Sequence, residues 1–327
     1  MGKILKQSFW STIVIYFGVL LGFINSIILF PKFLSTEQIG LIRQIISMSS
    51  ILIPITTFGV SGAYVKFYSQ FKKSQKLKDQ FFSFNLLIII ISYSCISIII
   101  FIFFDDLKYL FIKKSNLFLE YFYIVYYILF IMSISTLIES YLRSRYDTIM
   151  SNIINGVSNR FFTSISVILL SLSLIEFKSL IKIQILIYAF GLFVLIYYAN
   201  KIDKIYITSK LNDIKSQFKK ILNFSSYSFL ASFSNIIVLN IDVLMVSSLL
   251  GLSQTGIYTT AFYIGMVIEI PRRAISQISI PFISENVKKN NFKKIEKNYK
   301  EISLHQILIG ILFFILIITN LDSIYNL

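Results

Sequence analysis

Residues 200–220, NKIDKIYITSKLNDIKSQFKK, interrupt an otherwise apolar chain with six lysines. Long apolar stretches precede this segment, and the same pattern starts again after it. Leu211, Ile214, Phe218 and Ile221 recur at helical spacing, so we expect an amphipathic helix on an anionic membrane surface. The segment therefore predicts a charged cytoplasmic linker between two sets of membrane-spanning helices.

The composition predicts that the chain lies in a membrane. It has 327 residues, of which 56% are hydrophobic and 14% are charged, and its mean hydropathy is +0.75. Soluble domains carry about 25% charged residues, which they need to cover the apolar core. An all-α polytopic membrane protein is the class that fits these values. With one histidine and one cysteine, the sequence shows no cluster of metal ligands, and we expect neither a metal nor another cofactor.

A membrane-spanning helix needs about 20 largely apolar residues. Nine stretches meet this requirement: 10–30, 39–63, 81–104, 117–138, 153–174, 180–198, 221–250, 257–280 and 302–318. The second contains Pro54 followed by two glycines, which predicts a kink. We therefore expect a six-helix bundle over residues 1–199, the basic linker over 200–220, and the first three helices of a second, incomplete bundle over 221–327.

The basic residues predict the orientation of the chain. If the N-terminus is cytoplasmic, 23 Lys and Arg residues lie in cytoplasmic segments and five lie in outer ones, as the positive-inside rule requires. Contact with anionic lipid headgroups then accounts for the formal net charge of +15 without any nucleic acid. The outer connections are short, the longest running from Asp105 to Ser115, so they leave little room for an extracytoplasmic catalytic domain.

A short internal repeat relates two of the outer turns. Residues 33–41, FLSTEQIGL, align with residues 249–257, LLGLSQTGI, at an offset of 216, and the two share Gln and Gly. Six spans lie between them, so both turns have the same orientation. This pattern indicates a parallel repeat about an axis along the membrane normal, one of the layouts that secondary transporters use.

Charged residues inside spans are the candidate substrate site. Arg160, about 10 Å into its span, either lines a cavity that attracts a phosphate, snorkels to the interface, or pairs with a neighbouring helix. Arg43, one turn below the outer surface, either reaches a phosphate at the outer mouth or contacts the headgroups. Asp242, with Asn240 nearby, is a candidate cation or proton site, a partner for an arginine, or a polar contact inside the second bundle.

Two further groups of charges stand at the cytoplasmic ends of spans. They are Glu139, Arg143 and Asp147, and Glu269, Arg272 and Arg273. Glu139, Arg143 and Asp147 follow one another at intervals of four residues, and Glu269 lies three and four residues before Arg272 and Arg273. These spacings suit ion pairs along one helix. We expect these pairs to be structural, although the same residues could gate an inner mouth.

Three stretches carry a family resemblance. They are residues 1–43, MGKILKQSFWSTIVIYFGVLLGFINSIILFPKFLSTEQIGLIR, residues 240–265, NIDVLMVSSLLGLSQTGIYTTAFYIG, and residues 268–284, IEIPRRAISQISIPFIS. The chain resembles the polysaccharide (O-antigen-type) flippases of the MOP superfamily, which also contains the MATE exporters and the lipid II flippases. The resemblance implies two helical bundles around a central cavity. This chain departs from that pattern by ending after nine predicted spans.

The resemblance also implies an activity: flipping of an undecaprenyl-pyrophosphate-linked oligosaccharide across the bacterial inner membrane by alternating access, for surface polysaccharide such as the O-antigen of lipopolysaccharide. Arg160 and Arg43 would then offset the desolvation of the diphosphate, while the bundles rock about the linker. The implied partners are the lipid-linked oligosaccharide, anionic lipids, and a glycan polymerase or glycosyltransferases.

Three other functions stay open from the sequence. A cation-coupled multidrug antiporter of the same superfamily would use Asp242 in preference to the arginines. A membrane glycosyltransferase or polymerase is the enzyme alternative, but Asp105 and Asp106 are the only acidic pair in the outer loops, so we expect no enzyme. A non-transporting partner of the glycan assembly machinery is the third.

Overall fold

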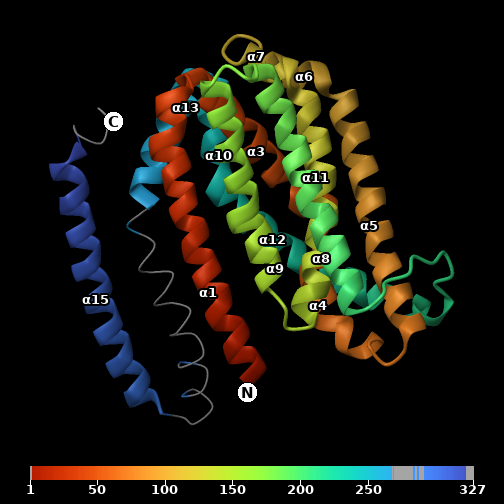
Figure 1. The fold of residues 1–327 in the computed structure, drawn as a ribbon. Coiled ribbons are helices and arrows are strands. Elements are labelled where there is room, and N and C mark those ends of the chain that lie inside the picture. Colours follow the sequence, from red (N-terminus) through yellow and green to blue (C-terminus); the bar gives the residue numbers. More distant parts are fainter. Residues whose placement is uncertain (1, 267, 269–282, 284–285, 287–290, 322–327) are drawn as a thin grey trace.

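The computed structural model describes residues 2–266, 268, 283, 286 and 291–321. Within these residues the chain is helical and contains no strand. In the described part of the chain, eight helices are long and apolar enough to cross a membrane. Figure 1 shows the long helices running between two ends of the molecule, with the N-terminus at the end opposite α6 and α7. The expected all-α polytopic fold is therefore confirmed.

Among the described residues, the elements follow one another without domain-sized insertions. Residues 2–202 form α1 (Gly2–Phe23), η1 (Ile24–Leu29), α2 (Phe30–Phe33), α3 (Thr36–Thr57), α4 (Val60–Phe71), α5 (Gln75–Ile102), α6 (Phe104–Phe111), α7 (Asn116–Glu120), α8 (Phe122–Ser144), α9 (Ile149–Asn152), η2 (Ile153–Ser158), α10 (Asn159–Ser171) and α11 (Phe177–Ile202). The rest of the described chain forms η3 (Asn212–Gln217), α12 (Phe218–Leu249), α13 (Leu252–Met266) and α15 (Phe292–Thr319). Here η1 and η2 are π-helical turns and η3 is a 3₁₀ turn.

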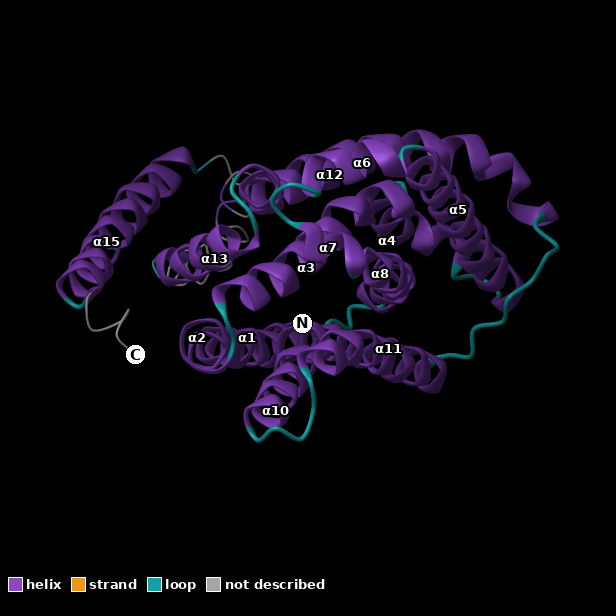
Figure 2. Ribbon diagram, turned by 90° about the horizontal axis from the view of Figure 1, so that it is seen from above, coloured by secondary structure: helices purple, strands orange, loops and turns teal. Residues whose placement is uncertain are grey.

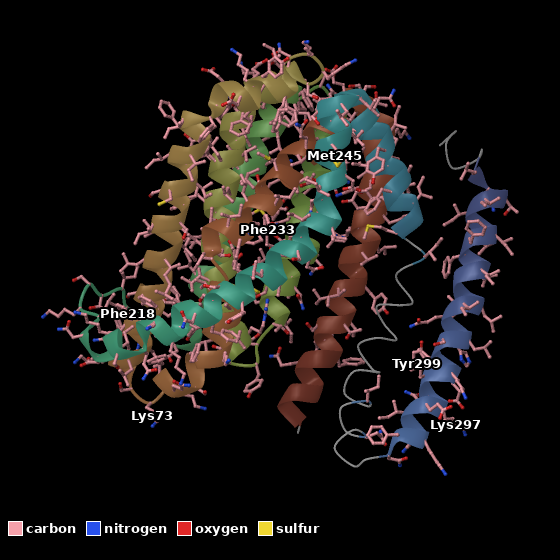
Figure 3. All side chains as sticks on the ribbon, turned by 180° about the vertical axis from the view of Figure 1, so that it is seen from behind. Lys73, Phe218, Phe233, Met245, Lys297 and Tyr299 are labelled. Atoms are coloured by element: carbon pink, nitrogen blue, oxygen red, sulfur yellow. The ribbon has the colours of Figure 1, made fainter. Side chains whose placement is uncertain are left out.

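Eight of the nine predicted spans coincide with these apolar helices. The other, 257–280, begins within α13 and continues past Met266 into residues outside the described part. Seen from one end, α3 lies between α1 and α12, and α13 lies between α3 and α15 (Figure 2). Figure 3 shows Lys73 and Lys297 toward the end at which the N-terminus lies in Figure 1.

The predicted kink separates α3 from α4. Ser35 and Gln38 form a capping box that starts α3, and Pro54 lies inside its last turn. Phe58 and Gly59 then take left-handed backbone conformations, with φ of 45° and 69°. A side chain at Gly59 would also overlap the backbone of Ser225 in α12. The break in the helix therefore lets α12 pack directly against the backbone at this corner.

The basic segment 200–220 differs from the amphipathic surface helix that its sequence predicts. Residues 203–211 are irregular, and only a 3₁₀ turn precedes α12. Ile214 and Ile221 are fully buried among residues of α4, α5 and α8, so their apolar faces pack on protein. Helical spacing alone could not distinguish burial against protein from burial in headgroups, because both need the same apolar face.

Backbone hydrogen bonds fix the segment further. The amide of Tyr206 donates to Asp79 Oδ1 (3.1 Å), and the amide of Thr208 donates to Ser83 Oγ (2.9 Å). Both acceptors belong to α5. A rocking motion about residues 200–220 would therefore have to break contacts that bind the segment to the first set of helices.

The two turns of the internal repeat contact each other. A Cβ at Gly40 would overlap the carbonyl of Leu252, and a Cβ at Gly256 would overlap the carbonyl of Thr36. Because Leu252 and Gly256 lie 216 residues after Thr36 and Gly40, the contact is reciprocal, as a two-fold relation between α3 and α13 requires. Thr36 Oγ1 and Ser253 Oγ are 2.6 Å apart beside it. The repeat thus joins the first set of helices to α13.

Candidate functional site

Two neighbouring cavities lie between the helices. The first, of ≈ 220 Å³, is lined by Gly22, Asn25, Ser26, Phe30, Ile42, Arg43, Ile46, Asn155, Asn159, Arg160, Thr163, Gln184, Tyr188 and Tyr263. The second, of ≈ 350 Å³, is lined by Ile53, Pro54, Thr57, Ser61, Met132, Ser135, Thr136, Glu139, Ile154, Asn155, Asn159, Tyr188, Leu192, Ser232 and Ile236. We call them the arginine chamber and the polar chamber. Asn155, Asn159 and Tyr188 line both and form their common wall.

Arg43 enters the arginine chamber from α3 and is held by neutral groups. Its Nη1 donates to the Tyr263 hydroxyl of α13 (2.9 Å), and its Nη2 donates to the Ser26 hydroxyl of η1 (2.6 Å). The guanidinium carbon lies 4.2 Å from the ring centroid of Tyr263 and 5.4 Å from that of Phe30. These ring faces attract the cation. The Arg43 side chain therefore lies in the lining of the arginine chamber.

Arg160 enters the same chamber from α10. Its Nη1 donates to the carbonyl of Gly18 in α1, and a Cβ at Gly22 would overlap the guanidinium. Its own carbonyl accepts hydrogen bonds from Asn25 Nδ2 and Ser164 Oγ, both at 2.9 Å. Gly22 thus leaves the space that the arginine side chain occupies, while Gly18 allows the backbone of Gly156 to approach α1. The side chain is oriented across the chamber rather than along its own helix.

Both π-helical turns are at this chamber. η1 contributes Asn25 and Ser26, and η2 contributes Asn155 and leads directly into Asn159 and Arg160. A π-helical turn inserts an extra residue, which rotates the following side chains about the helix axis, and such turns are frequent at functional sites. The turns therefore direct polar side chains of two apolar spans toward the same cavity.

Of the residues that line the arginine chamber, sequence reasoning singled out Arg43 and Arg160, and three of those that it missed carry polar groups important to the site. Tyr263 binds Arg43, while Gln184 and Asn159 each keep one buried polar atom, Nε2 and Oδ1 respectively, without a hydrogen-bond partner. Gln184 is 5% exposed, and Thr163 donates to its other amide atom, Oε1 (3.3 Å). A polar amide inside an apolar run was the available signal for Gln184 and Asn159. Tyr263 gave none, because tyrosines are frequent throughout this chain.

Asp242 and Asn240 lie outside both chambers. Asp242 accepts a hydrogen bond from the Tyr258 hydroxyl and one from the Val243 amide (2.9 Å), and it thereby links α12 to α13. Asn240 donates to the carbonyl of Ile236 in its own helix (3.0 Å). Asp242 thus makes a polar contact between helices of the second set.

The predicted ion pairs along α8 are not formed in the described structure. Glu139 Oε1 accepts from Asn155 Nδ2 (2.7 Å), and Asp147 Oδ2 accepts from the Tyr198 hydroxyl (2.8 Å). Arg143 is exposed and bridges to neither carboxylate. The prediction was wrong because these carboxylates bind polar groups of other helices, which the spacing along α8 does not reveal. The other predicted group, Glu269, Arg272 and Arg273, lies outside the described residues.

Ion pairs do form near this end: Lys76 Nζ pairs with Asp213 Oδ2 (2.7 Å), and two others involve Asp203, just after α11. It binds Arg145 Nη1 (2.6 Å) and Lys78 Nζ. Burial alone would raise the pKa of Asp203, but the hydrogen bonds from Lys78 and Arg145 outweigh it and hold that pKa below its usual value. This cluster joins the segment after α11 to α5 and to the end of α8.

Among the residues that the structure describes, no group of three His, Cys, Asp or Glu side chains is placed to hold a metal ion. The arginine chamber instead presents cations and amides, which are groups that bind anions.

Comparison with known proteins identifies the class of this fold. A solved structure described as an inward-facing conformation of a multidrug resistance MATE family transporter of the MOP superfamily is similar over 94% of this chain and 72% of that chain, with a TM-score of 0.73 and 16% identity. The molecule is therefore a multi-pass helical membrane protein with a MATE-like fold.

The family of polysaccharide biosynthesis proteins matches residues 4–287. The chain belongs to this family. Among curated proteins, none matches it significantly. The match confirms the resemblance stated from the sequence as far as a family of polysaccharide biosynthesis proteins, and the solved structure confirms the fold that the resemblance implied.

Proposed function

We propose that this protein flips a polyprenyl-pyrophosphate-linked oligosaccharide across the bacterial inner membrane for surface polysaccharide synthesis. The observation that carries the proposal is the meeting of Arg43 and Arg160, from α3 and α10, in one chamber. A diphosphate that leaves water loses several kcal/mol of solvation. Two guanidinium groups, which can each donate paired hydrogen bonds to phosphate oxygens, offset that loss.

The chamber supplies further donors for an anion. Gln184 Nε2 is buried there without a partner, and Arg43 is already oriented by neutral groups, so neither has to break an ion pair to receive a phosphate. Family membership and the transporter fold support movement of the substrate rather than its chemical conversion. The lipid tail stays in the bilayer while the headgroup crosses.

The position of Asp242 gives no support to the alternative of a cation-coupled multidrug antiporter that uses this residue, because it is bound between α12 and α13 away from both chambers. Drug efflux by cells that express the gene, together with normal glycan after its deletion, would favour that alternative.

The test is flipping of a fluorescent polyprenyl-diphosphate oligosaccharide by the purified protein in liposomes, with surface glycan measured in cells. Arg160→Ala should keep its abundance in the membrane and lose most flipping, and Arg160→Lys should recover part, since charge survives but the paired geometry does not. If Arg160 is instead a structural partner, Arg160→Ala lowers abundance. Normal abundance with normal flipping would refute the role of this residue.

The orientation is part of the proposal: the N-terminus and residues 200–220 face the cytoplasm. A cysteine placed at Lys215, after replacement of Cys95, should react with an impermeant reagent only in opened cells. Labelling of this cysteine in intact cells would contradict the proposed orientation.

A further inference from the structure

We infer that the polar chamber is the subsite for the first sugar of the lipid-linked substrate, and that Glu139 makes it select neutral or amino sugars over acidic ones. The inference rests on the proposed function, because it takes the diphosphate to occupy the arginine chamber. The two chambers share a wall of Asn155, Asn159 and Tyr188. In a lipid-linked oligosaccharide the first sugar is bonded directly to the diphosphate, so a diphosphate in one chamber places that sugar at or beyond this wall.

The polar chamber carries hydroxyl groups that are not committed to the protein. Ser61, Ser135 and Ser232 project from α4, α8 and α12, and none of the three makes a hydrogen bond in the described structure. Hydroxyls in a membrane helix ordinarily bind the carbonyl one turn earlier. On α8 itself, Ser133 donates to Leu129 (2.7 Å) and Thr136 to Met132 (2.8 Å). The uncommitted hydroxyls therefore face the chamber as donors and acceptors for a hydroxylated ligand.

Acceptors complete the chamber. Asn159 Oδ1 is buried without a partner at the shared wall, and Glu139 presents a carboxylate of which only Oε1 is engaged, by Asn155. A sugar ring offers several hydroxyl donors to such acceptors. The volume of ≈ 350 Å³ lies in the range of small-ligand sites, about 300–1,000 Å³.

The charge of the polar chamber is opposite to that of the arginine chamber. Glu139 is the charged residue among the described lining residues, and no Lys or Arg joins it there. A carboxylate in a site of low dielectric repels a second carboxylate strongly and attracts an ammonium group. The chamber should therefore accept an N-acetylhexosamine or a hexosamine and disfavour a hexuronic acid at the first position.

The experiment measures binding by the purified protein in detergent micelles. The four ligands are short-chain polyprenyl diphosphates that carry no sugar, an N-acetylhexosamine, a hexosamine or a hexuronic acid. The unsubstituted protein should bind the uronic acid ligand about tenfold more weakly than the N-acetylhexosamine ligand, since one like charge is brought into the chamber. Glu139→Gln should reduce this ratio to about threefold or less, because the amide keeps the hydrogen bond to Asn155 and removes the charge.

Two further variants separate the chambers. Ser135→Ala removes an uncommitted hydroxyl and should weaken binding of the sugar-bearing ligands while leaving the sugar-free ligand unchanged. Arg160→Ala should weaken all four ligands alike. Asp242→Asn, the matched control, removes a carboxylate of α12 outside both chambers and should leave every ratio unchanged.

The outcomes distinguish the two proposals. If Arg160→Ala weakens all ligands but Glu139→Gln and Ser135→Ala leave their ratios unchanged, the polar chamber is not the sugar subsite and only this inference is overturned. If no ligand binds the unsubstituted protein, the proposed function and the inference both fall. If Glu139→Gln and Asp242→Asn changed the ratio of ligand affinities equally, the effect would come from the overall charge of the protein. That result would also overturn the inference about the polar chamber.

Discussion

Arg43 and Arg145 show two ways in which this chain places an arginine. Arg145, at the end of α8, binds the carboxylate of Asp203 at 2.6 Å, and the pair joins the segment after α11 to the bundle. Arg43, inside the bundle, is held by two hydroxyls and two ring faces, and none of these partners carries a charge.

The difference separates a charge that holds the fold from a charge that can receive a ligand. A carboxylate partner neutralises an arginine and competes with any other anion for it. Hydroxyls and aromatic rings orient the guanidinium but leave its charge uncompensated, so an entering diphosphate has no ion pair to displace. If the proposed function holds, we therefore expect Arg43 to serve binding and Arg145 to serve stability, and each expectation can be tested.

Arg43→Ala should cause the largest loss. Removal of the guanidinium forfeits charge-assisted hydrogen bonds to the substrate, about 3 kcal/mol, which corresponds to about 100-fold in flipping rate at low substrate concentration. Because its partners are neutral groups, no buried carboxylate is left unpaired, and membrane abundance should stay near normal. Flipping in liposomes and immunoblots of membranes measure the two quantities. If membrane abundance fell in proportion to flipping, Arg43 would stabilise the fold, as we expect of Arg145, and would not be shown to bind the substrate.

The next largest effect should come from moving the helix that carries Tyr263. Gly256→Leu forces α13 away from α3, because a side chain there overlaps the carbonyl of Thr36. Tyr263 then leaves Arg43, and we expect flipping to fall by about tenfold, the equivalent of one lost charged hydrogen bond. The control is Gly265→Leu on the same helix, where a Cβ meets nothing within 4 Å. Equal effects of the two substitutions would show that α13 does not position the chamber.

Sequence patterns predicted the spans, the repeat and two of the candidate residues. Hydropathy located the spans because a lipid-exposed helix must be apolar along about 20 residues. The similarity between residues 33–41 and 249–257 predicted an internal repeat. The reciprocal contact explains why both stretches carry a glycine, since only glycine permits the two backbones to approach so closely. Arg43 and Arg160 were recognised as candidates because charge inside a span is costly.

The sequence did not predict which groups these residues contact. Glu139 was predicted to pair along its own helix, but it binds Asn155 of η2, and Ile214 was predicted to face lipid, but it is buried on protein. Spacing reports which residues share a helix face, and it does not report which helix lies opposite that face. The shared wall of the chambers depends on π-helical turns, which have no sequence signature in a single chain.

Asp203→Asn should have a smaller effect, on stability rather than on flipping. Loss of a part-buried carboxylate that serves Arg145 and Lys78 should cost about 1 kcal/mol, or about fivefold in the folded-to-unfolded ratio. The folded-state pKa of Asp203 is below its usual value, so its contribution is present above the ordinary Asp pKa of about 3.9 and is lost as pH falls through the folded-state pKa. In thermal unfolding in detergent, the unfolding temperatures of the unsubstituted protein and Asp203→Asn should differ at pH 7 and converge in strong acid. If the difference in unfolding temperature persists in strong acid, it arises from packing rather than from charge.

The smallest effect, and the finest test of the comparison, is expected for Tyr263→Phe. The substitution removes the hydroxyl that accepts from Arg43 Nη1 at 2.9 Å but keeps the ring, whose centroid lies 4.2 Å from the guanidinium. Ser26 still accepts from Nη2, so we expect the orientation of Arg43 to loosen without being lost, and flipping to fall by about threefold, near the low end for one hydrogen bond. Tyr263→Leu removes the ring as well and should approach the loss seen in Gly256→Leu. If Tyr263→Phe lost as much flipping as Arg43→Ala, the Tyr263 hydroxyl would be as important as the guanidinium. Arg43 would then depend on one fixed partner, as Arg145 does, and the contrast between the two arginines would fail.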